Sequence, residues 1–224
     1  MTTTEFSNEF DILYNNIMSN GSPGLTEYEK SVFLTQAQEA LVIGFYNGKL
    51  TGESFEVTEE VRTYISNLVK QATLSTTSGN SIVPGSVFYA LPDDCWFVTY
   101  ESAILTDSAL GCQNNKQVIV KPVTQDDFYR VSRNPFLGAN YRRVLRLTSG
   151  NKSELISKYS MSNYTIRYLT RPTPIILTTL SGGLTINGQT AITECQLDEA
   201  IHRTILEKAV QLARLAWMEL GKTQ

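Results

Sequence analysis

Helical periodicity at both ends of this chain, on either side of a strand-rich middle, constrains the fold more than any other feature of its 224 residues. Large apolar residues recur at intervals of three and four before residue 75 and again near the C-terminus, which is the spacing of one helix face. The four stripes consist of Phe6, Phe10, Leu13 and Ile17; Phe33, Ala37, Leu41 and Gly44; Val61, Ile65, Leu68 and Ala72; and Leu197, Ala200, Ile201, Ile205, Leu212 and Ala216. They predict three N-terminal helices and one C-terminal helix, which Gly221 is placed to terminate.

Two of these helices carry N-terminal signals. Thr26 is followed three residues later by Glu29, the spacing of a capping box, in which each side chain bonds the backbone amide of the other residue. Thr58 is followed by Glu59 and Glu60, whose carboxylates favour the positive end of a helix dipole. These signals place helix starts near residues 26 and 58.

Between residues 86 and 192 the composition shifts to β-branched and aromatic residues punctuated by glycine, proline and asparagine, which is typical of strands and turns. A short helix over Asp126–Arg133, with Thr124 as its N-cap, is expected to interrupt the strands. The expected strands are Val87–Leu91, Trp96–Leu105, Gln117–Lys121, Arg143–Thr148, Glu154–Tyr159 and Tyr164–Thr170, with shorter ones at Ile175–Thr178 and Leu184–Ile186.

A C-terminal helix on its own would leave its apolar face in water, so we expect it to pack on the three N-terminal helices. The predicted fold is therefore α+β: a four-helix bundle, made of the three N-terminal helices and the C-terminal helix, with a strand-rich insert. In this interpretation the chain is a single subunit. Its helical part comprises residues 4–75 plus 195–221, and its strand-rich part comprises residues 82–192.

Charge is distributed unevenly along the chain. From Phe128 to Ser153 five arginines and Lys152 occur without an acidic residue, so this segment carries +6 and the remainder −9, against a net charge of −3. Such a split indicates a surface that meets the opposite charge on a second copy, on another protein or on nucleic acid; a solvated basic hairpin is the alternative. The arginines are Arg130, Arg133, Arg142, Arg143 and Arg146.

Residues typical of catalytic or metal sites are scarce. The one histidine, His202, lies beside the apolar stripe of the last helix, and the three cysteines are not spaced as zinc ligands. Three acidic pairs consist of adjacent residues, which point to opposite faces of a strand or act as capping charges. These pairs are Glu59/Glu60, Asp93/Asp94 and Asp126/Asp127. We therefore expect no enzymatic activity, no metal and no cofactor.

The sequence also bears on where the protein is made. The longest apolar run, Ala40 to Tyr46, is too short to span a bilayer, and the first residues lack the basic start and apolar core of a signal peptide. An odd number of widely spaced cysteines is typical of reduced thiols in a protein made in a cytoplasm. We expect no membrane partner.

Several segments, taken in their order along the chain, resemble the head-to-tail connector (ring or adaptor) proteins of short-tailed, crAss-like bacteriophages. They are Gly24–Val42, Leu91–Trp96, Val120–Phe136, Arg142–Leu147, Tyr164–Leu177 and Cys195–Ala213. The resemblance covers nearly the whole chain. It implies a structural virion protein at the portal vertex or tail, synthesised in the cytoplasm of the bacterial host.

The resemblance implies further that the chain forms a homo-oligomeric ring, a dodecamer, stacked below the portal and surrounding the DNA channel. Its partners would be other copies of itself, the portal protein and other connector or tail proteins, with the genomic DNA close by. No catalytic residues are implied. Two alternatives stay open: a DNA-binding virion protein, disfavoured by the isoelectric point of 5.3, and a carboxylate-based tail hydrolase, disfavoured by the lack of a convincing acidic pair.

The arginine run itself favours a protein partner. If Arg142–Leu147 is an extended strand, each of its faces carries both arginine and aliphatic side chains. That mixture suits a protein interface better than a DNA-tracking groove, and the planar guanidinium binds carboxylates bidentately. We expect several of Arg130, Arg133, Arg142, Arg143 and Arg146 to contact acidic groups of a neighbouring subunit or of an adjoining connector protein.

Overall fold

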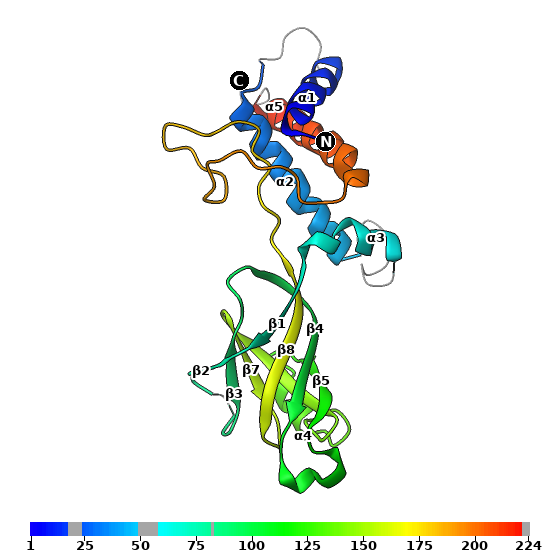
Figure 1. Ribbon diagram of the computed structural model, residues 1–224, viewed down its shortest axis with the longest axis vertical. Coiled ribbons are helices and arrows are strands. Elements are labelled where there is room, and N and C mark those ends of the chain that lie inside the picture. Colours follow the sequence, from blue (N-terminus) through cyan, green and yellow to red (C-terminus); the bar gives the residue numbers. More distant parts are fainter. Residues whose placement is uncertain (18–23, 49–57, 82, 221–224) are drawn as a thin grey trace. The chain divides into compact units, whose positions relative to one another are not determined.

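Segments from both ends of the chain build one unit of the computed structural model, and the middle of the chain builds another (Figure 1). The helical unit comprises Met1–Leu68 and Arg171–Gln224, and the sheet unit comprises Val69–Thr170. The residues that the structure describes are 1–17, 24–48, 58–81 and 83–220.

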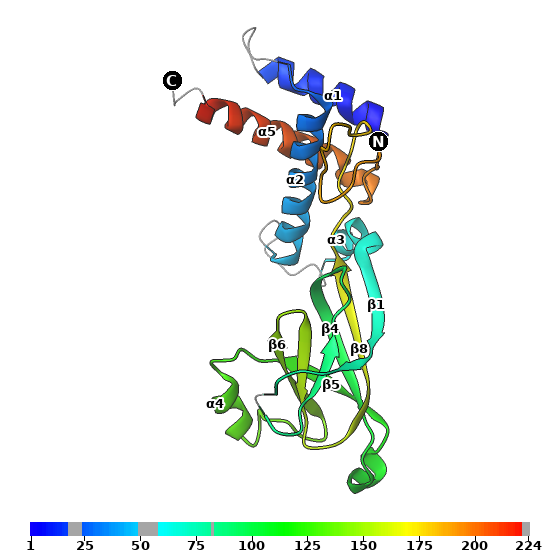
Figure 2. The ribbon, with the colours of Figure 1, turned by 90° about the vertical axis from the view of Figure 1, so that its left-hand side faces the viewer.

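Three long helices form most of the helical unit, and α2 crosses both α1 and α5 in Figures 1 and 2. Within the described ranges no helix is long and apolar enough to cross a membrane. The elements of this unit are α1 (Thr3–Ile17), α2 (Glu27–Tyr46), α3 (Glu59–Tyr64) and α5 (His202–Leu220), with 3-10 turns η1 (Ser66–Leu68) and η3 (Glu199–Ile201).

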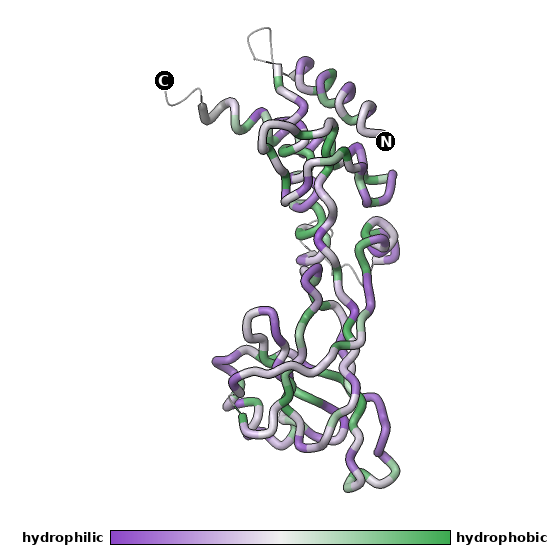
Figure 3. The backbone as a smooth tube through the Cα atoms, turned by 60° about the vertical axis from the view of Figure 1, so that its left-hand side comes forward, coloured by the Kyte–Doolittle hydropathy of each residue, from purple (hydrophilic) through white to green (hydrophobic). Residues whose placement is uncertain are grey.

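α1 buries one aromatic stripe, made of Phe6, Phe10 and Tyr14 at intervals of four residues. The alternation of hydrophobic and hydrophilic residues around its turns is visible in Figure 3. At its start the Thr2 amide donates to Glu5 Oε2 at 2.8 Å, and the Glu5 amide donates to Thr2 Oγ1 at 3.3 Å. These reciprocal bonds satisfy amides that the first helical turn leaves without partners, so α1 also begins with a capping box.

The capping box expected at the start of α2 is confirmed. The Glu29 amide donates to Thr26 Oγ1 at 3.3 Å, and the Thr26 amide donates to Glu29 Oε2 at 2.8 Å. Beyond the cap, Ala37 and Leu41 of the predicted stripe are buried, and so is the neighbouring Leu34. α2 is therefore a helix that packs in the core, and its first residue is determined by the local sequence.

One side of α2 is both polar and buried, because the extended segment 173–177 lies along it. Thr35 Oγ1 accepts a hydrogen bond from the Ile175 amide at 3.1 Å and donates to the Ser31 carbonyl at 2.8 Å. Ser31 and Gln38 also bond this segment through their side chains. Side chains of α2 thus supply partners for backbone groups that have no strand neighbour.

The predicted four-helix bundle is wrong. The helix expected from Thr58 to Ala72 ends at Tyr64, and from Val69 the chain is a strand that pairs with another strand. Ala72 packs on the core of the sheet unit. Its position therefore fits the spacing of one strand face as well as that of one helix face. Segment 173–177 covers a side of α2 that a further helix could have covered. The fold instead mixes helices with a curled sheet.

The described residues of the sheet unit form an eight-stranded sheet in the order β1-β8-β4-β5-β6-β7-β3-β2. Neighbouring strands are antiparallel except β5 and β6, which are parallel. The elements are β1 (Val69–Leu74), β2 (Thr76–Thr77), β3 (Val87–Ala90), β4 (Cys95–Leu105), η2 (Ser108–Gln113), β5 (Lys116–Pro122), α4 (Phe128–Arg133), β6 (Arg143–Ser149), β7 (Lys152–Ile156) and β8 (Met161–Thr170).

Side chains alternate between an inner and an outer face of this sheet. The inner face encloses a core to which Tyr164 and Ile166 of β8 contribute. On the outer face of β6 and β7, Phe128 of α4 belongs to a second buried cluster with Leu145 and Ile156. Over β1, β8, β4 and β5 the outer face is largely exposed.

Six of the expected strands are confirmed as β3 to β8, with ends that differ by up to three residues. The expected strands at Ile175–Thr178 and Leu184–Ile186 form only isolated bridges. Their apolar residues pack against Tyr28 and Val32 of α2 instead of a neighbouring strand, because a helix covers them. Gly221, expected to end α5, lies outside the described residues.

Candidate interaction surfaces

The connection between the parallel strands β5 and β6 carries three of the five predicted arginines. Parallel neighbours require a crossover, because the chain must return to the same end of the sheet before it enters the second strand. Residues 123–142 make this crossover, and Figure 2 shows α4 with its flanking loops beside β6. The helix begins one residue after Asp127, so Asp127 is the N-cap and the expected cap Thr124 lies outside it.

The inner side of the crossover is anchored, whereas its outer side is exposed. Phe128 and Ala139 are buried on the outer face of the sheet. On the other side Phe136 is 84% exposed and Tyr129 is 63% exposed. What we call the crossover surface consists of Tyr129, Arg130, Arg133, Phe136, Tyr141 and Arg142.

The three arginines of the crossover surface stay accessible. Arg130 Nη2 lies 2.8 Å from Asp127 Oδ1, but the arginine side chain is 77% exposed, and such surface pairs contribute about 0–1 kcal/mol. The Arg142 guanidinium lies over the Tyr141 ring, with Cζ 5.0 Å from the ring centroid. Arg133 is exposed at the end of α4, where the described residues give it no acidic partner. All three guanidinium groups are available to a partner.

Arg143 and Arg146 are used within the subunit. Arg143 Nη1 donates to the carbonyls of Phe136 at 3.0 Å and Leu137 at 3.1 Å, which ties the crossover to β6. Arg146 Nε lies 3.0 Å from Glu101 Oε1, and their side chains are 12% and 7% exposed. The distance is that of an ion pair, although Nε is not aligned for a hydrogen bond. Sequence reasoning could not separate these two arginines from the others, because it did not show that both faces of β6 are covered.

Glu101 joins Arg146 to Tyr164 in a buried polar cluster on the inner face. Tyr164 Oη donates to Glu101 Oε2 at 2.7 Å. Burial raises the pKa of Glu101, and the Arg146 charge and the Tyr164 hydrogen bond act in the opposite direction. Burial and the Glu101 charge raise the pKa of Tyr164. This cluster links β4, β6 and β8 through one ion pair and one hydrogen bond.

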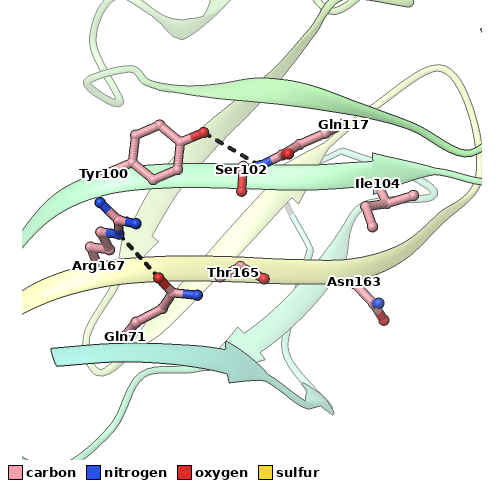
Figure 4. A pocket seen from close by; sticks show the side chains of 8 residues that line it. All are labelled: Gln71, Tyr100, Ser102, Ile104, Gln117, Asn163, Thr165 and Arg167. Carbon is pink, nitrogen blue, oxygen red and sulfur yellow. Dashed lines mark hydrogen bonds between the residues drawn. The ribbon is translucent and has the colours of Figure 1, made fainter.

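A second exposed surface covers the outer face of β1, β8, β4 and β5 (Figure 4). It forms an open hollow of about 460 Å³, and Arg167 is its one charged lining residue. Arg167 Nε donates to Gln71 Oε1 at 3.0 Å, and Gln117 Nε2 donates to Tyr100 Oη at 3.4 Å. What we call the outer patch consists of Gln71, Tyr100, Ser102, Ile104, Gln117, Asn163, Thr165 and Arg167, together with Ile119, which pairs with Ser102. Sequence reasoning missed this surface.

The residues considered for catalysis are dispersed. His202 is buried, and its Nε2 lies 3.0 Å from the Leu197 carbonyl, so this nitrogen donates; burial lowers the pKa of His202. Asp94 pairs with Lys70 at 2.7 Å, and Asp127 pairs with an arginine of the crossover surface. Within the described ranges no three His, Cys, Asp or Glu side chains gather as they do around a metal ion.

Two of the three thiols are also unsuited to nucleophilic chemistry at neutral pH. Cys95 and Cys195 are half-buried, and burial raises the pKa of each thiol to about 11. A reactive cysteine needs a lowered pKa, because the thiolate is the nucleophile. The two exposed surfaces of the sheet unit are the candidate functional features.

Comparison with known proteins agrees with an assembly role. A family model described as phage tail ring protein 3/4 matches residues 1–223. Ring protein 3 of Bacteroides phage crAss001 is 48% identical over 225 residues, which cover 98% of each chain. Ring protein 4/5 of the same phage is 38% identical over 231 residues, which cover 97% of this chain and 94% of the relative.

These matches confirm the resemblance to crAss-like phage ring proteins that the ordered segments indicated. The similarity extends through both the helical unit and the sheet unit. The chain belongs to the phage tail ring protein 3/4 family.

Proposed function

We propose that this chain is a structural subunit of a head-to-tail connector ring, a dodecamer stacked below the portal at the portal vertex and surrounding the DNA channel. Its partners are copies of itself, the portal protein and other connector or tail proteins. Membership of the ring protein family and the two ring relatives support this proposal. A head-to-tail ring needs two different surfaces on every copy, related by a rotation that closes.

The crossover surface is the observation that carries the proposal. Phe136 and Tyr129 are exposed beside Arg133 and Arg142, and aromatic residues with arginine are enriched in the energetically important centres of protein interfaces. We propose that Arg130, Arg133 and Arg142 contact acidic groups of a neighbouring subunit or of an adjoining connector protein. Arg143 supports this surface from inside by holding the Phe136 carbonyl.

A second copy of the chain offers acidic groups of the required kind. The residues of the sheet unit include 11 basic and 7 acidic side chains, a formal charge of +4. The residues of the helical unit include 8 basic and 15 acidic side chains, a formal charge of −7. Every copy therefore carries both of the charges that an unlike pair of surfaces needs for electrostatic complementarity.

Binding of duplex DNA has less support. Duplex binding rests mainly on lysine and arginine contacts to phosphates, and two of the five arginines bond groups within the subunit. The remaining three share the crossover with exposed aromatic side chains, which phosphate contacts do not require. The acidic pairs give a hydrolase no support: Glu59 and Glu60 lie in the first turn of α3, and Asp94 and Asp127 each pair with a basic side chain.

Imaging of the purified protein by negative-stain electron microscopy tests the proposal. Rings are expected in the protein alone or after mixing with the portal protein. Monomers in both samples, together with tight and salt-sensitive binding to duplex DNA, would point to the DNA-binding alternative instead.

A further inference from the structure

The outer patch has an unusual composition for the exposed face of a sheet. Of the eight side chains that line its hollow, Arg167 alone is charged, and none is Lys, Asp or Glu. Amide and hydroxyl groups fill most other positions, and Ile119 and Tyr100 are 54% and 45% exposed. Depletion of Lys, Asp and Glu around apolar and aromatic residues is typical of the centre of a protein interface.

Because side chains alternate along each strand, the residues of this patch lie together on the outer face of the sheet. Ser102 pairs with Thr165 of β8 and with Ile119 of β5, and paired residues point to the same face. In Figure 2 β1 and β8 lie at one side of the sheet unit, and α4 with β6 lies at the other. The outer patch thus lies on the outer face over β1, β8, β4 and β5, and the crossover covers that face over β6 and β7. The two meet where Ile119 pairs with Arg143.

We infer that the outer patch is a surface through which one copy of this chain contacts the next copy in the ring. This inference rests on the proposed function, because a subunit of a closed head-to-tail ring contacts a neighbour on each of two sides. The lack of charge argues against the other occupants. DNA phosphates would require a row of cations, and a strongly acidic or basic protein would require the opposite charge, whereas the patch offers one guanidinium.

The area of the patch limits how much of the interface between two copies it can supply. The patch spans residues 163–167 of β8, 100–104 of β4 and 117–119 of β5, together with Gln71 of β1. At about 3.3 Å along a strand and about 4.8 Å between strands, these positions cover on the order of 200 Å². A standard interface buries about 800 Å² on each partner. The outer patch therefore accounts for about a quarter of one side of the contact, and adjoining parts of the same copy supply the rest.

A charge placed in the patch tests the inference, because burying an unpaired carboxylate at an interface is strongly unfavourable. Ile119→Glu is the test variant and Ile192→Glu is the matched control, since the two isoleucines are 54% and 53% exposed. Gln117→Glu is a second test variant of almost unchanged shape at another exposed position of the patch. Circular dichroism and thermal unfolding establish that each variant is folded.

Rings of the wild-type protein are counted first, alone and after co-expression with the other structural proteins of its phage. We expect Ile119→Glu and Gln117→Glu to lose rings, and Ile192→Glu to keep them. A photo-crosslinking residue at position 119 should join two copies of this chain in assembled rings.

The outcomes separate this inference from the proposed function. If wild-type protein forms no rings in either setting, the proposed function fails. If wild-type rings form and both patch variants assemble equally well, the outer patch is not a contact between copies, and the proposed function stands. Crosslinks from position 119 that reach only a different virion protein or DNA would also overturn the inference, and they remain informative if Ile119→Glu fails to fold.

Discussion

Arg146 belongs to the basic segment, but it forms an ion pair inside the subunit. Its guanidinium neutralises Glu101 inside the sheet unit, and both side chains are largely buried. Arg146→Met keeps much of the aliphatic length but leaves Glu101 without its counter-charge. We expect this change to lower the free energy of unfolding by about 3–5 kcal/mol, as removal of one partner of a buried ion pair typically does. Urea unfolding followed by circular dichroism measures the loss.

The control for this change is Arg142→Met, at an exposed position four residues earlier. It should alter the free energy of unfolding by no more than about 0.5 kcal/mol. The double variant Glu101→Gln/Arg146→Met should recover part of the loss, because no buried charge is then left alone. Equal costs for Arg146→Met and Arg142→Met would show that the internal pair does not stabilise the subunit.

Glu101 also predicts how stability depends on pH. Burial raises the pKa of Glu101 above its ordinary value of 4.5, so the folded protein binds this proton more tightly than the unfolded chain does. Its contribution to stability is therefore greatest below pH 4.5 and declines as the pH rises from 4.5 through the raised pKa. We expect the wild type to lose stability relative to Glu101→Gln across that window. A difference between the two that is independent of pH would contradict the raised pKa.

Helix α2 depends on polar side chains that bond an irregular segment. Thr35→Val preserves the shape of the side chain but leaves the buried Ile175 amide without its acceptor. An unsatisfied buried amide costs about 1–3 kcal/mol, so the free energy of unfolding should fall by that amount. Thr204→Val, at an exposed position of α5, is the matched control and should have little effect. Hydrogen exchange of the Ile175 amide should accelerate in Thr35→Val; unchanged exchange would mean that another group accepts this bond.

Elements marked by local signals could be predicted from the sequence, and elements decided by distant neighbours could not. Strands β3 to β8 were predictable, because period-two alternation and turn residues mark them locally. The capping box at Thr26 was predictable for the same reason. Ile175 and Ile176 gave a strand-like signal, yet they pack on a helix, and Ala72 fitted a helical stripe while lying in β1. In both cases a distant neighbour decided the outcome, and local spacing contains no information about that neighbour.

For the whole molecule, the arginine run was visible in the sequence but its division was not. Only the pairing of β6 with β5 and β7 shows that Arg143 and Arg146 point into covered faces, leaving Arg130, Arg133 and Arg142 on the surface. The outer patch left a weaker signal: few charged residues at positions that come from four separate strands. That signal emerges only when the register brings those positions together, whereas the family could be identified from the order of segments alone.

The surface arginines give the decisive prediction for assembly. Arg133→Glu/Arg142→Glu reverses two exposed charges of the crossover surface, so the subunit should fold normally while ring or connector assembly is impaired. The matched control is Arg62→Glu/Arg203→Glu, which reverses two exposed arginines of the helical unit. Sedimentation and negative-stain imaging without DNA report assembly, and raised salt should weaken wild-type assembly in the same direction, because it screens exposed charges. If the reversed protein joins its partners normally but DNA packaging or retention fails, the crossover surface faces the DNA channel, and its assignment to a protein partner is wrong.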